Sequence, residues 1–392
     1  MPRIARAILT IVLGGLLAGQ VVRTAAVASD SSGSLAVRLW PSHPEVLVDR
    51  TMAEIGLRAA RGQSLTPAIL RQVNQVASKA PLAPEPFLIQ GALAQVQQDQ
   101  GRAERLFAAA EAREPRSVAA RYFLADRYLR TGRTSRALAE IAVLSDLFPQ
   151  GMVGFGPALA TFAPTPGAVP QLRRLFHSSP RLEPVVLSSL ADDAKNAKLI
   201  LTLWGRPAST VDPAASQWQA KLINALVDQG QFGSAYAVWR RVTGEQDSRG
   251  ALFNPQFAKS TIPPPFNWAL ATAGGVVEPI ADGQLQVIYF GRSDTILAEQ
   301  LLLLGPGQYE LSMDISKPPG EGGEIAWSLA CAPGKEALAR LPIDRRGRAA
   351  VGFTVPQGCA AQRLRLTGTP GDFPKSQDFS IGKLSLAKVT GA

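Results

Sequence analysis

The stretch that decides the fold reads PEPFLIQGALAQVQQDQGRAERLFAAAEAREPRS over residues 84–117 and VAARYFLADRYLRTGRTSRALAEIAVLSDLFPQG over residues 118–151. Residues of similar type recur 34 positions apart in these two segments: Gly91 and Ala125, Ala103 and Ala137, Pro115 and Pro149. Small residues let two antiparallel helices pack closely, and proline ends a helix. A period of this size is typical of a helical solenoid, whose surface usually holds partners. The sequence therefore predicts a binding or scaffolding role.

Helical periodicity extends on both sides of this pair and predicts a helical repeat domain over residues 44–248. A weaker third copy lies at residues 218–244, where Gly230 stands 98 residues after Gly132, close to three periods. Short helices broken by proline are expected over residues 152–212. Degenerate repeats are therefore expected between the copies.

These segments resemble the tetratricopeptide repeat family, in which small residues lie where paired helices cross and proline ends the second helix. Gly132 matches the turn between the helices, whereas Gln98 takes its place in the earlier repeat. Phe87 holds the first aromatic position, and Arg121 replaces it one repeat later. The family lines its concave surface with the first helix of each repeat. The resemblance thus implies partner-binding candidates, against the alternative of an ordinary solvated face: Gln95, Tyr122, Asp126, Arg127 and Arg130.

The sequence period changes from 3.6 to 2 near residue 250. Tyr309, Leu311, Met313 and Ile315 alternate with polar residues, and Pro/Gly turns separate several such runs. Short alternating strands bounded by turns predict an antiparallel β-sandwich over residues 251–390. The predicted fold class is therefore multidomain, an α-solenoid followed by a β-sandwich.

The sandwich segment resembles carbohydrate-binding modules with the galactose-binding-type jelly-roll fold. The resemblance rests on LFNPQF at residues 252–257, FNW at residues 266–268 and GPGQYELS at residues 305–312. Flat aromatic rings bury the CH-rich faces of sugars, and polar neighbours bind the hydroxyls. The glycan-binding candidates are Phe266, Asn267, Trp268, Tyr289, Phe290, Arg292 and Asp294. The fold also occurs without a glycan ligand, so burial of Trp268 and Tyr289 would favour a purely structural sandwich.

The N-terminus has the order of an export signal. Two arginines precede the uncharged run of residues 7–22, and small residues follow at 24–28. We expect residues 1–28 to be a signal peptide or a retained membrane anchor, and residues 29–43 to be a linker. This order predicts a bacterial periplasmic protein, tethered to the inner membrane where the segment is retained.

Charge and cysteine content narrow the choice of partners. The net charge is +10, and residues 251–392 carry thirteen basic and twelve acidic residues, which leaves +9 for the first 250. That excess fits an acidic partner or an anionic membrane, or simply an arginine-rich composition, because only ten of the forty-one basic residues are lysine. No nucleic-acid motif is present, so no nucleic-acid partner is predicted. In an exported chain Cys331 and Cys359 are expected to pair, and two free thiols are the alternative.

Catalytic motifs are missing from the sequence. The two histidines lie far apart, and no metal-ligand spacing, phosphate-binding loop or nucleophile motif occurs. No metal and no cofactor are therefore expected. The sequence predicts a non-catalytic envelope scaffold that binds a protein partner through its repeats, with a sandwich suited to polysaccharide. The alternatives are a pure protein scaffold and, less favoured, a glycan-active enzyme, which needs two facing carboxylates.

Overall fold

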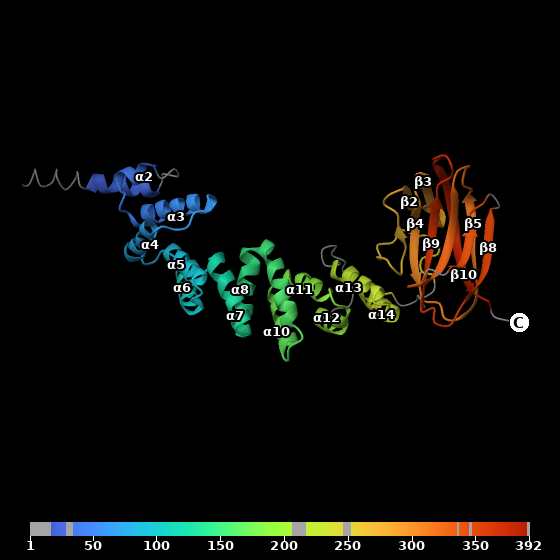
Figure 1. Cartoon of the computed structure of the whole chain (residues 1–392), viewed down its shortest axis with the longest axis horizontal. Coiled ribbons are helices and arrows are strands. Elements are labelled where there is room, and N and C mark those ends of the chain that lie inside the picture. Colours follow the sequence, from blue (N-terminus) through green and yellow to red (C-terminus); the bar gives the residue numbers. More distant parts are fainter. Residues whose placement is uncertain are drawn as a thin grey trace, which may run out of the picture. The chain divides into compact units, whose positions relative to one another are not determined.

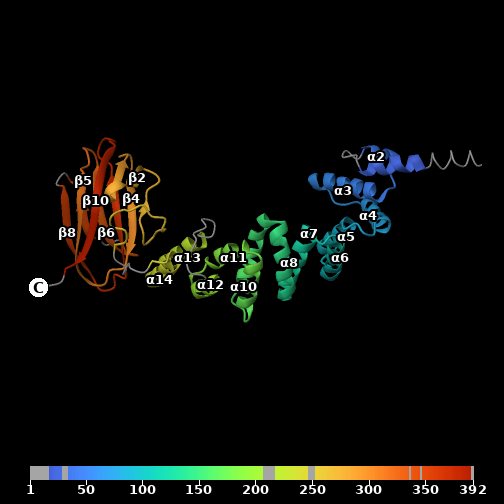
Figure 2. The ribbon, with the colours of Figure 1, turned by 180° about the vertical axis from the view of Figure 1, so that it is seen from behind.

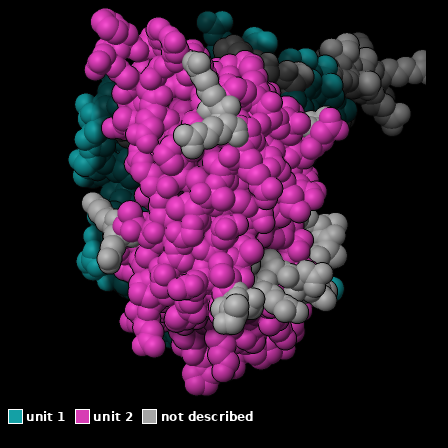
Figure 3. All heavy atoms as spheres, turned by 90° about the vertical axis from the view of Figure 1, so that its right-hand side faces the viewer, with its two compact units in different colours: residues 1–153, 177–180 teal, residues 154–176, 181–392 magenta. Residues whose placement is uncertain are grey.

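The computed structural model describes residues 17–28, 34–205, 217–245, 252–334, 337–344 and 347–389. The chain divides into two compact units, one of residues 1–153 with 177–180 and the other of residues 154–176 with 181–392 (Figure 3). Most of the predicted export segment, residues 1–16, lies outside the described residues. Among the residues that are described, no helix combines the length and apolarity that a membrane span requires.

The first unit is built from antiparallel helix pairs (Figures 1 and 2). Residues 17–28 are helical, and the helices that follow are α2 (Ser34–Leu39), α3 (Pro44–Ala60), α4 (Pro67–Lys79), α5 (Glu85–Val96), α6 (Gln100–Arg113), α7 (Val118–Arg130) and α8 (Thr134–Leu147). The pairs α3–α4, α5–α6 and α7–α8 pack along their lengths. The 34-residue period of the sequence is thus a repeat of helical hairpins.

Small residues fix the close crossing of α5 and α6. A Cβ added at Gly91 would lie 2.9 Å from the ring of Phe107. Ala103 and Ala137, one repeat apart, are fully buried at the equivalent positions of α6 and α8. The turns repeat as well, because Gln98 (φ 63°) and Gly132 (φ 70°) both adopt the left-handed conformation. The departure at Gln98 therefore changes the residue but not the turn.

The helices lying mainly in the second unit continue the pattern with shorter elements. They are α9 (Gly156–Phe162), α10 (Ala168–Ser178), α11 (Leu182–Leu190), α12 (Ala197–Trp204), α13 (Gln217–Asp228) and α14 (Phe232–Thr243), with the 3-10 turn η2 (Ala194–Asn196). A second 3-10 turn, η1 (Pro149–Phe155), crosses from the first unit into the second. Gly230 (φ 70°) forms the turn between α13 and α14. Ala235 and Trp239 are fully buried. The third copy of the repeat is therefore a helical hairpin, as predicted.

The C-terminal part is an antiparallel β-sandwich of two five-stranded sheets. The strands are β1 (Ala269–Leu270), β2 (Gly275–Ile280), β3 (Gln284–Tyr289), β4 (Thr295–Leu302), β5 (Gly307–Lys317), β6 (Glu324–Ala332), β7 (Ala337–Pro342), β8 (Arg348–Val355), β9 (Ala361–Thr369) and β10 (Gln377–Lys388). One sheet has the order β1-β4-β9-β6-β7 and the other β2-β3-β10-β5-β8. The predicted fold class, an α-solenoid followed by a β-sandwich, is confirmed.

Alternation along the strands places the core between the two sheets. On β5, Leu311 and Met313 are buried, whereas Glu310 and Asp314, which flank this pair, are exposed. Trp327 of β6 lies in the same core without exposed surface. Cys331 and Cys359 form a disulfide with a Cα–Cα distance of 5.5 Å, so the predicted pairing is confirmed.

Candidate functional site

A groove of about 910 Å³ lies in the first unit and is the main candidate binding site. Its lining comes from α5, α6, α7 and the end of α8: Leu88, Ile89, Ala92, Gln95, Phe107, Val118, Ala119, Tyr122, Phe123, Asp126, Arg130 and Phe148. This volume is in the upper range of ligand pockets. Four of the five predicted partner-binding residues, Gln95, Tyr122, Asp126 and Arg130, line this one groove.

Helical spacing explains why these side chains meet. Tyr122, Asp126 and Arg130 are four residues apart on α7, so they form one stripe along the helix. Arg130 Nε lies 2.8 Å from Asp126 Oδ2, an exposed ion pair on the rim. Tyr122 keeps 41% of its surface exposed. One paired acid and base and a partly exposed tyrosine therefore share the same stripe of α7.

The floor of the groove is apolar and rigid. The rings of Phe107 on α6 and Phe123 on α7 are stacked with their centroids 4.0 Å apart. Both rings are more than nine-tenths buried, which fixes their positions. Ala92 and Ala119 are exposed small residues of the lining, so they leave room above the floor. Such a surface suits apolar side chains of a bound segment.

Sequence reasoning did not identify the apolar lining residues or Phe148, which is 41% exposed after α8. A signal was present, because Leu88 and Ala92 precede Gln95 at helical spacing and Val118 precedes Tyr122 by one turn. Each of these apolar residues lies on the same helix face as a predicted binding residue, one or two turns closer to the start of its helix. Extending the predicted face in that direction would have identified them. Phe148 carries no such signal, since it follows the last turn of its helix.

Arg127 is the one predicted partner-binding residue that does not line the groove. Its Nε lies 3.2 Å from Glu104 Oε2, and Arg133 Nη1 lies 2.5 Å from Glu104 Oε1. The hydrogen bond from Arg133 is the main cause that holds the pKa of Glu104 below its usual range; burial opposes it, and Arg127 adds to it. The structure therefore places Arg127 in an ion-pair cluster that links α6 to α7 and to the turn that follows.

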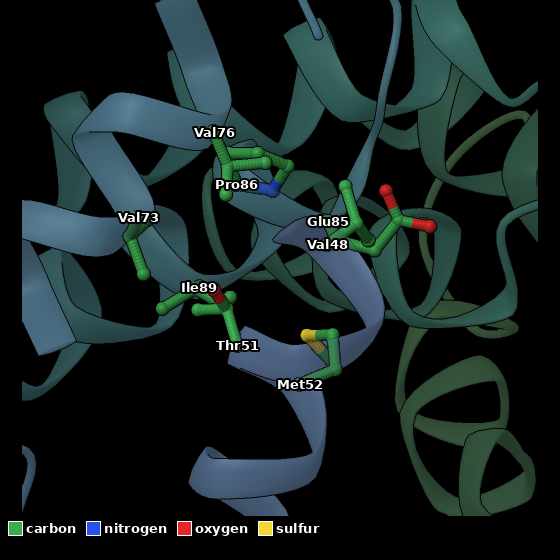
Figure 4. Close-up of a pocket in the computed structure, with 8 residues that line it drawn as sticks. All are labelled: Val48, Thr51, Met52, Val73, Val76, Glu85, Pro86 and Ile89. Atoms are coloured by element: carbon green, nitrogen blue, oxygen red, sulfur yellow. The ribbon is translucent and has the colours of Figure 1, made fainter. Parts of the chain in front are cut away.

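A small apolar pocket lies between α3, α4 and α5 in the same unit (Figure 4). Figure 4 labels residues of all three helices around it, among them Thr51 and Met52 of α3, Val73 of α4 and Ile89 of α5. Its volume is only about 10 Å³, which is close to the space that one water occupies. Ile89 lines both this pocket and the groove. The pocket is thus a packing defect behind the groove, too small for a ligand.

Four predicted glycan-binding residues are buried: Phe266, Asn267, Trp268 and Tyr289. Trp268 Nε1 donates to the carbonyl of Asn254 at 2.9 Å, and its ring packs against Trp327. Tyr289 is fully buried, and its hydroxyl donates to the carbonyl of Ser293 at 2.7 Å. Buried rings offer no face to a sugar, so in this structure these side chains stabilise the fold.

The other three candidates, Phe290, Arg292 and Asp294, are exposed in the loop between β3 and β4. The loop between β9 and β10 reaches them, because a Cβ at Gly291 would lie 2.1 Å from the carbonyl oxygen of Lys375. That second loop presents Phe373, which is 79% exposed. One end of the sandwich, here called the loop end (residues 290–294 and 370–376), therefore carries two exposed phenylalanines among charged side chains.

Clusters suited to a metal are missing from the part of the chain that the structure describes: no three His, Cys, Asp or Glu side chains come together there.

No family model matches the chain, and no curated protein matches it. Solved structures are similar to its two parts at low identity. A structure titled "CBM4 structure and function" is 12% identical, with a TM-score of 0.30, over 36% of this chain and 100% of that one. The structure of TmCBM61 in complex with β-1,4-galactotriose is 14% identical, with a TM-score of 0.26, over the same shares. Yeast Tom70 is 13% identical, with a TM-score of 0.26, over 55% of this chain and 45% of that one. The chain is thus similar to tetratricopeptide-type helical proteins and to jelly-roll carbohydrate-binding modules.

Proposed function

We propose that this chain is a non-catalytic scaffold whose groove binds an apolar segment of a protein partner. The observation that carries the proposal is the groove itself, which unites Gln95, Tyr122, Asp126 and Arg130 over an apolar floor. Asp126 and Arg130 neutralise one another, so the rim favours a segment with little net charge. An amphipathic helix or an extended apolar strand has the required chemistry.

The test uses the full chain and a displayed library of random peptides. Ala92→Arg places a long charged side chain in the groove, and Ala112→Arg places the same side chain on an exposed site of α6 outside it. Both changes retain a good helix former. We expect apolar peptides that bind saturably, lose binding at least about tenfold with Ala92→Arg and keep it with Ala112→Arg. Equal loss in both variants, or no selected peptide, would contradict the proposal.

A second proposal concerns glycans, and its support is the pair of exposed phenylalanines at the loop end. Phe290 and Phe373 lie among Arg292, Asp294 and Lys375, so rings and hydrogen-bonding groups stand together. Saturable binding of the full chain to a polysaccharide, lost with Phe373→Ala, is the expected result. Absence of binding across a panel of bacterial polysaccharides would favour the purely structural sandwich, which the burial of Trp268 and Tyr289 supports.

We also propose that the chain works in the bacterial envelope, either tethered by residues 1–28 or released after their cleavage. The order of charges and apolar residues there supports export. The disulfide supports an oxidising compartment. Fractionation of expressing cells, with N-terminal sequencing of the mature chain, separates the two forms. Recovery of the full chain in the cytosol with reduced cysteines would contradict export.

A further inference from the structure

Trp239 is fully buried although α14 is the last helix before the sandwich. Its indole Nε1 donates to the carbonyl of Pro263 at 2.8 Å. The rings of Phe253 and Phe266 stand edge-on to it, at centroid distances of 5.3 and 5.6 Å. Tyr236, one turn earlier on α14, meets Phe266 at 5.0 Å. The face of α14 is therefore covered by residues 252–268, the segment that opens the sandwich, here called the strap.

The strap is fixed to the first sheet by a buried side chain. Gln300 of β4 has no exposed surface, accepts from the backbone N–H of Phe253 at 2.9 Å and donates to the carbonyl of Phe253 at 2.9 Å. Leu301, the next residue of β4, donates its N–H to the carbonyl of Pro265 at 2.8 Å. Phe253 and Phe266 are the two residues that pack on Trp239. The backbone of Phe253 is bonded to β4, and so is that of Pro265, the neighbour of Phe266.

The strap is also bonded to the second sheet. Leu384 of β10 donates its N–H to the carbonyl of Pro255 at 3.0 Å. Trp268 Nε1 reaches back to the carbonyl of Asn254, which closes the strap on itself. Backbone groups bonded to both sheets cannot shift without breaking partly buried hydrogen bonds, which are costly to leave unmade.

Few contacts cross an ordinary flexible connection between domains. Here the compact division of the chain falls near residue 153, and the helices from α11 to α14 belong to the same unit as the sandwich. We propose that α14 and the strap form an intramolecular docking joint, so that the α13–α14 hairpin and the sandwich move as one body. This inference goes beyond the proposed function and does not depend on any ligand. It implies that a ligand on the sandwich is held at a fixed orientation to the last helical hairpin.

Hydrogen exchange of the full chain, followed by mass spectrometry, tests the joint. Trp239→Ala removes the indole from the joint. We expect amides of the strap and of α14 to exchange at least about tenfold faster, while those of β5 in the sandwich core stay unchanged. Trp218→Ala is the matched control, because Trp218 is equally buried on α13 but packs on Trp204 of α12. That control should loosen α12 and α13 and leave the strap protected.

Two further variants keep the test decisive where Trp239→Ala does not fold. Trp239→Phe keeps a ring but removes the donor to Pro263, and it should accelerate the same amides to a smaller extent. Phe253→Leu acts from the sandwich side and should loosen α14, since coupling between two parts is reciprocal. Unchanged strap exchange in the Trp239 variants, or equal opening of the strap by Trp218→Ala, would overturn the proposal.

Discussion

Arg121 Nη1 lies 2.5 Å from Glu140 Oε2, and this contact joins α7 to α8 at the position where the previous repeat has an aromatic ring. Glu111 of α6 approaches the same nitrogen at 2.9 Å. One guanidinium therefore serves two carboxylates on two helices. Burial raises the pKa of Glu140, the charge of Glu111 raises it further, and Arg121 opposes both.

Glu140→Gln is expected to raise the free energy of unfolding at pH 7, by no more than about 1 kcal/mol. A carboxyl with a raised pKa binds its proton more tightly in the folded chain. The stability from that proton is present below the unfolded pKa of 4.5 and is lost as the pH rises through the folded value. Glutamine mimics the protonated form of Glu140. The gain in stability of Glu140→Gln over the unchanged chain should therefore shrink as the pH falls. Urea unfolding from pH 7 to pH 4 measures this.

The pKa of Glu104 is shifted in the opposite direction to that of Glu140. Its pKa is lowered, so its contribution is present above the unfolded value and is lost as the pH falls through the folded one. Glu104→Gln should therefore destabilise the chain at pH 7, and the deficit should shrink in acid. Glu54→Gln, in an exposed pair with Arg58 at 3.8 Å, should change stability little at either pH. Parallel pH profiles for Glu140→Gln and Glu104→Gln would contradict this assignment.

Gln98→Gly is expected to stabilise the first unit by roughly 0.5–1 kcal/mol. A non-glycine residue in the left-handed conformation costs about 1–2 kcal/mol, and the greater freedom of glycine in the unfolded chain offsets part of the gain. Gly132→Gln is the reverse experiment, because no atom lies within 4 Å of a Cβ built at Gly132. The Gly132→Gln variant should have a free energy of unfolding that is lower by a similar amount, as measured by urea unfolding. A loss of stability with Gln98→Gly would show that the side chain of Gln98 matters more than its backbone.

Gly91→Ala is expected to destabilise the α5–α6 hairpin by about 1–3 kcal/mol, because its methyl group would meet the ring of Phe107. Gly56→Ala on α3 is the matched control, since a Cβ there has no atom within 4 Å. That control should stabilise the chain by up to about 1 kcal/mol through helix propensity alone. Thermal unfolding measures the change in melting temperature of each variant. Equal changes for Gly91→Ala and Gly56→Ala would contradict the close crossing of α5 and α6.

Reduction of the Cys331–Cys359 disulfide is expected to lower the stability of the sandwich by about 3.5 kcal/mol. The bond closes a loop with a sequence separation of 28, and the loss follows from the entropy that the unfolded chain regains. Unfolding of the sandwich with and without reductant measures it. The helical hairpin α5–α6 should be unaffected, and a Cys331→Ala, Cys359→Ala double variant should match the reduced chain.

The sequence predicted the repeats and the strands because both rest on local patterns. Gly91 and Ala103 are small because paired helices cross closely there, and this crossing recurs every 34 residues. Leu311 and Met313 alternate with polar neighbours. Helical periodicity likewise brought Tyr122, Asp126 and Arg130 to one face. Features that repeat along the chain are therefore visible without any structure.

Residue type alone did not separate surface aromatics from buried ones. Trp268 and Tyr289 have the chemistry of a sugar platform, yet they fill the sandwich, because a large ring suits a core and a binding surface equally. The sequence also did not predict the joint at Trp239. Trp239 lies in the helical repeat segment, whereas its partners Phe253 and Phe266 lie in the sandwich segment. Long-range contacts of this kind leave no periodic trace in the sequence.

The disulfide also limits how far the chain can be drawn out under tension. A pulling force applied to the two termini would normally extend residues 331–359 by roughly 3.3–3.6 Å per residue, but the bond holds their ends 5.5 Å apart. The oxidised chain thus withholds roughly 90 Å of contour length, and β7 and β8 lie inside the withheld segment. The oxidised sandwich would therefore keep part of its length unextended even when the rest of the chain is stretched.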